Sequence, residues 1–142
     1  MATRKRLPAD RNSITHRVEI QDERGGVCDV YMTVGLYPLK AKEKPGELFL
    51  KSGKMGSAMR GMLDIVGLQA SLLMQYGVPL QVICDKMKGV GFEPCGKTDD
   101  PDIPECKSVP DYVFRWMEKR FLERTNGRSY DTKISKEILE DK

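Results

Sequence analysis

Apolar and polar positions alternate along the first part of the chain, which is the pattern of half-buried β-strands. In the stretch 14–20, the isoleucines, the valine and the histidine share one face and the polar residues share the other. β-Branched and aromatic residues then fill 28–37, and a shorter stretch of the same kind follows at 47–51. Consecutive strands joined by short turns usually pair antiparallel. The pattern therefore predicts a small antiparallel sheet of about three strands.

The spacing of apolar residues changes to that of helices after the third strand. Residues 57–76 are apolar nearly all round, which is typical of a helix buried on every side. A second helix is predicted over 79–88. A third begins at Ser108, where Ser108 and Asp111 resemble a capping box, and ends near 126–127. The fold class is therefore α+β, with the sheet packed against two or three helices.

The organisation expected is one domain with two short extensions. A chain of 142 residues has the usual size of a single domain. We expect a basic N-terminal arm over 1–13, the α+β domain over 14–127, and a C-terminal tail over 128–142 that could form a short helix if it docks. Residues 89–105 hold too many glycines and prolines for a regular element, and a loop of this length is often functional.

The net charge of +3 is too small to indicate a nucleic-acid partner by itself. Five basic residues gather in 4–17 against the single acid Asp10. Such an arm can hold phosphates loosely, but we interpret it as a solvated tail.

The cysteines and the chain's first residues bear on the compartment. No apolar run approaches the roughly 18 residues of a membrane helix, and the basic start is not followed by the apolar stretch of a signal peptide. The four cysteines are scattered and form no CxxC pair, so we expect reduced thiols and a cytoplasmic protein. A zinc site is disfavoured because His16 is the only histidine.

The junction between the third strand and the long helix is the most informative segment. Its glycines let the backbone approach a ligand closely, and free N–H groups at a helix start attract anions. The residues predicted to hold a phosphate here are Lys51, Ser52, Lys54, Gly56, Ser57 and Arg60. The spacing is not that of a Walker motif. The alternative is that Ser57 only caps the helix, the glycines form a turn and the lysines are solvated.

A second group of candidate residues lies in the loop 89–105. Phe92, Lys97 and Thr98 stand near glycines, and an aromatic ring in such a loop can stack on a base. The alternative, which we favour for Phe92, is that its ring plugs the core. His16 has no evident partner on its strand, and without a second histidine there is little for a Ser-His or Cys-His arrangement. The sequence therefore supports no catalytic set.

Short motifs in one order along residues 7–121 carry a family resemblance. Among them are Thr15-His16-Arg17, Gly61-Met62-Leu63-Asp64, Gln75-Tyr76-Gly77-Val78-Pro79-Leu80, Phe92-Glu93-Pro94 and Tyr112-Val113-Phe114-Arg115-Trp116. In these motifs the chain resembles the C-terminal domain of class II, adenosylcobalamin-dependent ribonucleotide reductase, which is related to the TSCPD-type domains.

The resemblance implies a domain separated from reductase chemistry. In that family the barrel, the radical cysteine and the cobalamin site lie upstream, and a cysteine-rich tail follows the domain. None of this fits the present chain, where 123–142 contains no cysteine. The family also tends to have an acidic residue before the Gly-Ser pair, whereas this chain has Lys54, which places an extra cation at the helix start.

From the residues and the resemblance together we expect a non-catalytic, stand-alone domain that needs no cofactor. It would bind a nucleotide or another phosphate-bearing ligand, with sequestration as one such role. We also expect a homo-oligomer in which 28–37 and the third helix contribute to a symmetric interface, and no membrane partner. The alternative is an accessory subunit of a split class II reductase that docks on a catalytic chain encoded separately.

Overall fold

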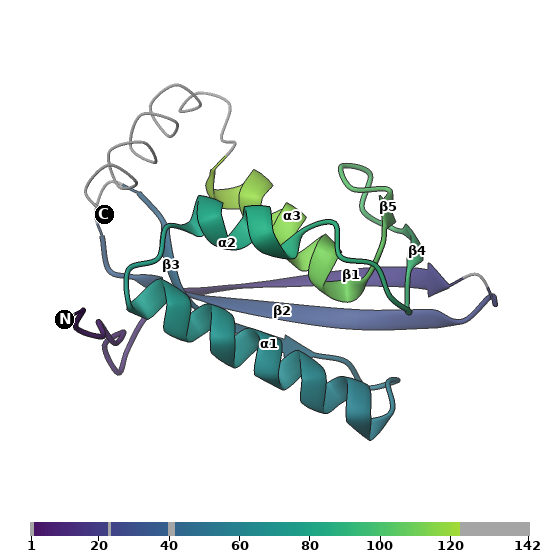
Figure 1. Ribbon diagram of the computed structural model, residues 1–142, viewed down its shortest axis with the longest axis horizontal. Helices are drawn as coiled ribbons and strands as arrows, with labels where there is room; N and C mark the ends of the chain where they lie inside the picture. Colours follow the sequence, from purple (N-terminus) through teal and green to yellow (C-terminus); the bar gives the residue numbers. More distant parts are fainter. Residues whose placement is uncertain (1, 23, 40–41, 123–142) are drawn as a thin grey trace.

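The computed structural model describes residues 2–22, 24–39 and 42–122, and this part of the chain forms a sheet and three helices (Figure 1). The strands are β1 Ser13–Asp22, β2 Val27–Tyr37, β3 Lys44–Lys51, β4 Gly96–Thr98 and β5 Glu105–Cys106. The helices are α1 Ser57–Gln75, α2 Leu80–Met87 and α3 Val109–Phe121. The α+β class is confirmed.

The sheet has five strands in the order β3-β2-β1-β4-β5, and each neighbouring pair is antiparallel. The expectation of about three strands is corrected by two further strands, β4 and β5. Strand β4 lies within the segment 89–105, which was expected to be irregular, and β5 begins at its end. These strands have three and two residues, too short to show an alternating pattern. They form because Ile20, Gln21 and Asp22 of β1 present a free edge with which β4 pairs.

One face of the sheet is buried beneath the helices and the other is open. The inward side chains Val18, Ile20, Val30, Met32 and Val34 have no exposed surface. The helices complete this core mainly through Leu63 of α1 and through Tyr112, Val113, Phe114 and Met117 of α3. On the open face most side chains are exposed or half-buried, Glu47 being the buried exception, and the exposed large apolar residues there are Val27, Tyr31 and Phe49.

Helix α1 lies along the outer edge of β3. The backbone N–H of Leu48 donates to Ser71 Oγ at 2.8 Å, and Gln75 Nε2 donates to the carbonyl oxygen of Gly46 at 3.0 Å. Side chains of α1 therefore satisfy backbone groups that an edge strand leaves unpaired. The side of α1 that faces away from the sheet is exposed, contrary to our expectation of a helix buried on every side. In Figure 1, nothing among the described residues packs on that side.

The predicted start of α3 is confirmed at the level of its hydrogen bonds. Ser108 is the N-cap, and its Oγ accepts from the backbone N–H of Asp111 at 3.0 Å. The Asp111 carboxylate accepts from the backbone N–H of Lys107 at 2.9 Å and from that of Gly89 at 2.6 Å. The cap therefore also fixes the start of the long loop onto α3.

The N-terminal arm is held against the domain rather than solvated throughout. Arg4 Nε donates to Gln75 Oε1 at 2.7 Å, and Arg11 forms an ion pair with Glu47 at 2.7 Å. The backbone N–H of Lys5 donates to the carbonyl oxygen of Gln75 at 2.8 Å. The expected tail over 128–142 and the expected helix end near 126–127 lie outside the described residues. Within the described part, no helix combines the length and apolar content that crossing a bilayer requires.

Candidate functional site

The start of α1 carries no side-chain cap. Its N-cap is Gly56, whose backbone is extended (φ −64°, ψ 164°), and no side chain accepts from the first N–H groups of the helix. Ser57 is already the first helical residue, so it does not cap the helix as the alternative interpretation required. The N–H groups of the first turn therefore remain available to an anion, which the positive end of the helix dipole attracts.

A hollow of about 520 Å³ lies at this junction between β3 and α1. Its lining includes Lys51, Ser52, Ser57 and Arg60, together with one carboxylate, that of Asp64. Within the described residues, neither the Lys51 nor the Arg60 side chain makes a hydrogen bond or an ion pair. The Ser52 hydroxyl is buried and lies 3.4 Å from Cys28 Sγ. The hollow thus combines two cations that form no ion pair, the Ser57 hydroxyl group and the open start of a helix, which is the chemistry of a site for an anionic group.

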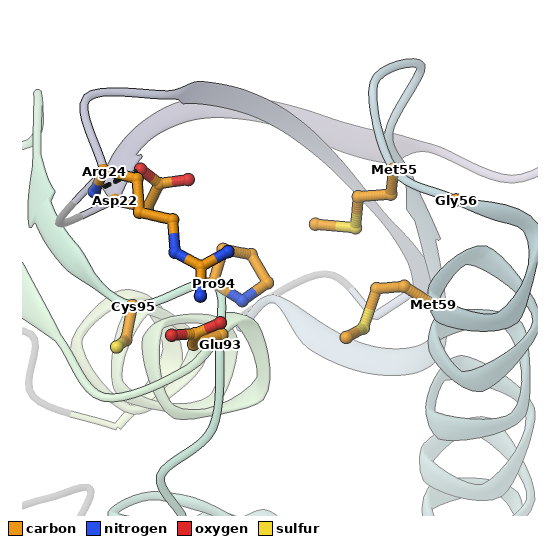
Figure 2. A pocket seen from close by; sticks show the side chains of 8 residues that line it. All are labelled: Asp22, Arg24, Met55, Gly56, Met59, Glu93, Pro94 and Cys95. Carbon is orange, nitrogen blue, oxygen red and sulfur yellow. Dashed lines mark hydrogen bonds between the residues drawn. The ribbon is translucent and has the colours of Figure 1, made fainter.

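A second hollow, of about 290 Å³, lies on the other side of the same junction (Figure 2). It is lined by Asp22, Arg24, Met55, Gly56, Met59, Glu93, Pro94 and Cys95. Figure 2 shows the thioether side chains of Met55 and Met59 entering from the α1 side and the Arg24 guanidinium entering from the β1–β2 turn. Gly56 belongs to this lining, so the start of α1 borders both hollows. The wall is apolar on one side and charged on the other.

The remaining predicted residues lie in a third, more open depression of about 800 Å³. Phe92 and Lys97 line it, and it shares Asp22, Glu93 and Cys95 with the second hollow. Phe92 is 42% exposed, so its ring does not plug the core as we favoured.

Thr98 has a different role from the one predicted. Its hydroxyl accepts from the backbone N–H of Asp100 at 3.1 Å and donates to the carbonyl oxygen of Ile103. These bonds hold the turn that follows β4. The structure therefore uses the Thr98 hydroxyl inside its own loop.

The nine predicted binding residues fall into separate places. Lys51, Ser52, Ser57 and Arg60 meet in the first hollow, Gly56 borders the second, and Phe92 and Lys97 lie in the third. Lys54 belongs to the same junction, where it is exposed, but lines none of the three hollows.

Sequence reasoning missed the residues that join these places, notably Arg24, Met55 and Met59. The sequence around Arg24 indicated a turn, and turn chemistry does not reveal which helix the turn will face. The methionines fitted the apolar pattern of the long helix, which gave no reason to separate them from the core.

His16 belongs to a hydrogen-bonded cluster that lines none of these hollows. Its Nε2 lies 2.8 Å from the hydroxyl oxygen of Tyr112, and that hydroxyl donates to Asp100 Oδ2 at 2.6 Å. Because the hydroxyl proton goes to Asp100, Nε2 is the donor to Tyr112. The imidazole also stacks on Trp116, with ring centroids 4.8 Å apart. His16 is therefore a satisfied structural histidine.

Burial sets the protonation of this cluster. Desolvation lowers the pKa of His16 below its usual value, although the carboxylates of Asp100 and Asp99 oppose this. Desolvation also raises the pKa of Tyr112, and its hydrogen bond to Asp100 raises it further. A neutral imidazole and a protonated phenol follow from these directions. Among the described residues, no group of three or more His, Cys, Asp or Glu side chains could hold a metal ion.

Comparison with known proteins places the chain beside one family. The TSCPD domain matches residues 3–121. The chain is similar to vitamin B12-dependent ribonucleotide reductases, with 44% identity to the protein of Rhodopirellula baltica over 89% of the chain, and 41% to that of Streptomyces avermitilis over 84%. A more distant relative of the same name, from Agrobacterium fabrum, is 32% identical over 91% of the chain.

These matches cover only a small part of the relatives. The aligned region spans 11% of the Rhodopirellula protein, 12% of the Streptomyces protein and 10% of the Agrobacterium protein. No solved structure matches the chain significantly. The resemblance stated from the sequence motifs is confirmed.

Proposed function

Because the chain belongs to the TSCPD domain family, found in vitamin B12-dependent ribonucleotide reductases, we propose that it is a non-catalytic module that binds a nucleotide or another phosphate-bearing ligand. The observation that carries the proposal is the uncapped start of α1 beside unpaired cations. A phosphate there would accept hydrogen bonds from backbone N–H groups of the first turn, and Lys51 and Arg60 would balance its charge.

The neighbouring hollows support a ligand larger than phosphate alone. Met55 and Met59 offer a soft apolar wall, and sulfur contacts with aromatic rings are favourable. Arg24 supplies a planar cation that can stack on a base or pair with a further phosphate. A nucleotide bound by its phosphate at Ser57 would have this hollow within reach of its base, because Gly56 borders it.

Isothermal calorimetry with mono-, di-, tri- and cyclic nucleotides and with inorganic phosphate tests the proposal. Arg60→Ala and Lys51→Ala should each weaken binding by about ten-fold, since a charge-assisted hydrogen bond contributes about 1.5–3 kcal/mol. Added salt should weaken binding as well, because the hollow is open to solvent. Both substitutions should leave the midpoint of thermal unfolding nearly unchanged.

Lys86→Ala is the matched control, because Lys86 is an exposed lysine of α2 that lines none of the three hollows. It removes the same charge and should leave nucleotide affinity unaltered. Equal weakening in all three variants would indicate a response to net charge and would contradict a defined site. Failure of every nucleotide to bind below millimolar concentration would contradict the proposal outright.

The absence of catalysis is part of the proposal and is tested separately. The chain's one histidine is engaged with Tyr112 and Trp116, and the region shared with the reductases is about a tenth of their length. We expect no deoxynucleotide product from the purified chain with adenosylcobalamin and a dithiol reductant. Product formed under these conditions would contradict the non-catalytic role.

One observation favours a second candidate, an accessory subunit of a split class II reductase. The relatives carry this domain within chains for which it is 10–12% of the length, so the domain is compatible with a reductase assembly. This candidate is tested by mixing the chain with a class II catalytic chain that lacks the domain and measuring complex formation and turnover. A stable complex with raised turnover would favour the accessory role over a separate binding module.

A further inference from the structure

The outward face of α1 carries no charged residue along the whole helix. It consists of Ala58, Gly61, Met62, Ile65, Leu68, Gln69 and Leu72, and continues to Tyr76 at the C-cap. Met62, Ile65, Leu68 and Tyr76 are 57%, 47%, 58% and 44% exposed. The two charged residues of α1, Arg60 and Asp64, both line the hollow beside β3. A helix of this kind normally presents charged side chains to water, so this face is suited to contact with another apolar surface.

Gly61, which also lines the edge of the first hollow, is a second sign of contact. A glycine inside a helix costs about 1 kcal/mol relative to alanine, so it normally has a packing reason. Gly67 has one, because a Cβ there would lie 2.7 Å from the carbonyl oxygen of Leu48. A Cβ on Gly61 would meet no atom within 4 Å. The domain by itself therefore does not require glycine at 61, whereas a second helix approaching this face closely would benefit from it.

We propose that α1 packs antiparallel against α1 of a second copy of this chain, about a two-fold axis between Leu68 and Gln69. In this register Ile65 lies opposite the partner's Leu72, and Gly61 lies opposite the partner's Tyr76. The smallest residue of the face thus receives the largest one. The same pairings recur on the other side of the axis, as a two-fold contact requires.

The lack of charge favours a second copy over an unlike partner. In a two-fold contact, residues near the axis meet the same residues of the second copy. Charged side chains near the axis would therefore face like charges. An uncharged face avoids this repulsion, which would matter for a chain of net positive charge. A different partner could have balanced charges on α1 with opposite charges of its own.

The size of the face predicts a contact of moderate strength. A helix of 19 residues is about 28 Å long, and one such seam buries less than the roughly 800 Å² per partner of a standard interface. Beyond Leu68 the groove between α1 and β3 holds Lys51 and Asp64 beside Phe49, so the uncharged contact ends at Leu68. We therefore expect a dimer with a dissociation constant in the micromolar range.

Sedimentation velocity of the full chain across a wide concentration range tests the proposal. The wild-type chain should shift from monomer to dimer at micromolar concentration. Ile65→Glu should weaken the dimer by roughly 100-fold or more, because it places two unpaired carboxylates in the seam. The matched control is Lys86→Glu on the exposed part of α2, which should leave the dimer unchanged. Circular dichroism confirms that each variant is folded.

The register is tested by enlarging the residue at position 61 and shortening the residue at position 76 that is expected to lie opposite it. Gly61→Leu should weaken the dimer by about ten-fold, and adding Tyr76→Ala to the same chain should restore most of it. Gln69→Cys, next to the axis, should form a disulfide-linked dimer under mild oxidation with copper phenanthroline, whereas Lys86→Cys should not exceed the wild-type level. These variants keep the apolar face and so do not depend on the folding of Ile65→Glu.

Three results would overturn the proposal. One is a wild-type chain that stays monomeric up to millimolar concentration. Another is a dimer that survives Ile65→Glu, which would place the contact elsewhere. The third is a monomer whose α1 face is instead protected from hydrogen exchange by a reductase catalytic chain, which would assign the face to that partner. Nucleotide titration of the Ile65→Glu monomer keeps this test separate from the binding proposal.

Discussion

A Cβ atom placed on Gly67 would lie 2.7 Å from the carbonyl oxygen of Leu48, so α1 and β3 can approach as they do only with glycine at this position. Gly67→Ala should lower the free energy of unfolding by about 1–3 kcal/mol, because a backbone atom must move to admit the methyl group. Gly61→Ala on the same helix is the control and should raise it by up to about 1 kcal/mol. Urea denaturation at low protein concentration measures both. Equal effects of the two substitutions would contradict the close contact.

Asp111 is expected to be among the most sensitive polar residues of the domain. It is 2% exposed and accepts hydrogen bonds from the backbone N–H groups of Gly89 and Lys107. Asp111→Ala should destabilise the fold by about 2–4 kcal/mol, because it leaves two donors without their acceptor. Ser108→Ala should cost about 1 kcal/mol through loss of the N-cap. If both variants lost the same free energy of unfolding, the Asp111 carboxylate would contribute no more than the N-cap does.

The pKa of His16 predicts a loss of stability in mild acid. Because burial lowers this pKa in the folded chain, the unfolded chain binds the proton more readily. The stability that comes from keeping His16 neutral is complete above the pKa of the unfolded chain, about 6.5, and is lost as the pH falls below that value. Unfolding free energies measured by urea titration should therefore fall between about pH 7 and pH 5.

Two substitutions isolate this histidine. His16→Gln should flatten the decline in that pH range, since it removes the titrating group. Asp100→Asn should steepen it, because the Asp100 carboxylate partly opposes the effect of burial on the pKa of His16. An unchanged pH dependence in His16→Gln would assign the decline to other groups.

The cysteines should differ in their reactivity. Burial raises the pKa of Cys84 to about 12 and also raises that of Cys106. Since the thiolate is the nucleophile, iodoacetamide at pH 8 should modify the partly exposed Cys28 and Cys95 well before these two. Mass spectrometry of timed samples measures the order. Early modification of Cys84 in the folded protein would contradict its burial.

The long elements of the fold could be predicted because their patterns are local. Alternation in 14–20 led to β1, and the Ser108–Asp111 spacing led to the start of α3. The short strand Gly96–Thr98 could not be predicted, because three residues show no alternation and their pairing depends on the free edge of β1. The exposed side of α1 was missed for a related reason. Apolar residues on a helix predict contact, but they do not say whether the contact lies within one chain.

The candidate site also contains residues whose positions could be predicted from the sequence and residues whose positions could not. Lys51, Ser57 and Arg60 meet because one strand leads directly into one helix, so their proximity follows from sequence order. Phe92 and Lys97 depend on the path of the loop after α2, which has no period from which to place it. Arg24 reaches the second hollow because its side chain extends from the β1–β2 turn toward Glu93 and Pro94 (Figure 2), and no local pattern indicates this direction.

The bonds from Ser71 and Gln75 to the edge of β3 have a consequence for solubility. An uncovered edge strand offers its backbone as a template on which strands of other molecules can add, and this is a common route to aggregation. In this chain the Leu48 N–H and the Gly46 carbonyl group are already occupied from α1. The helix thereby shields the outer strand from adding strands of neighbouring molecules.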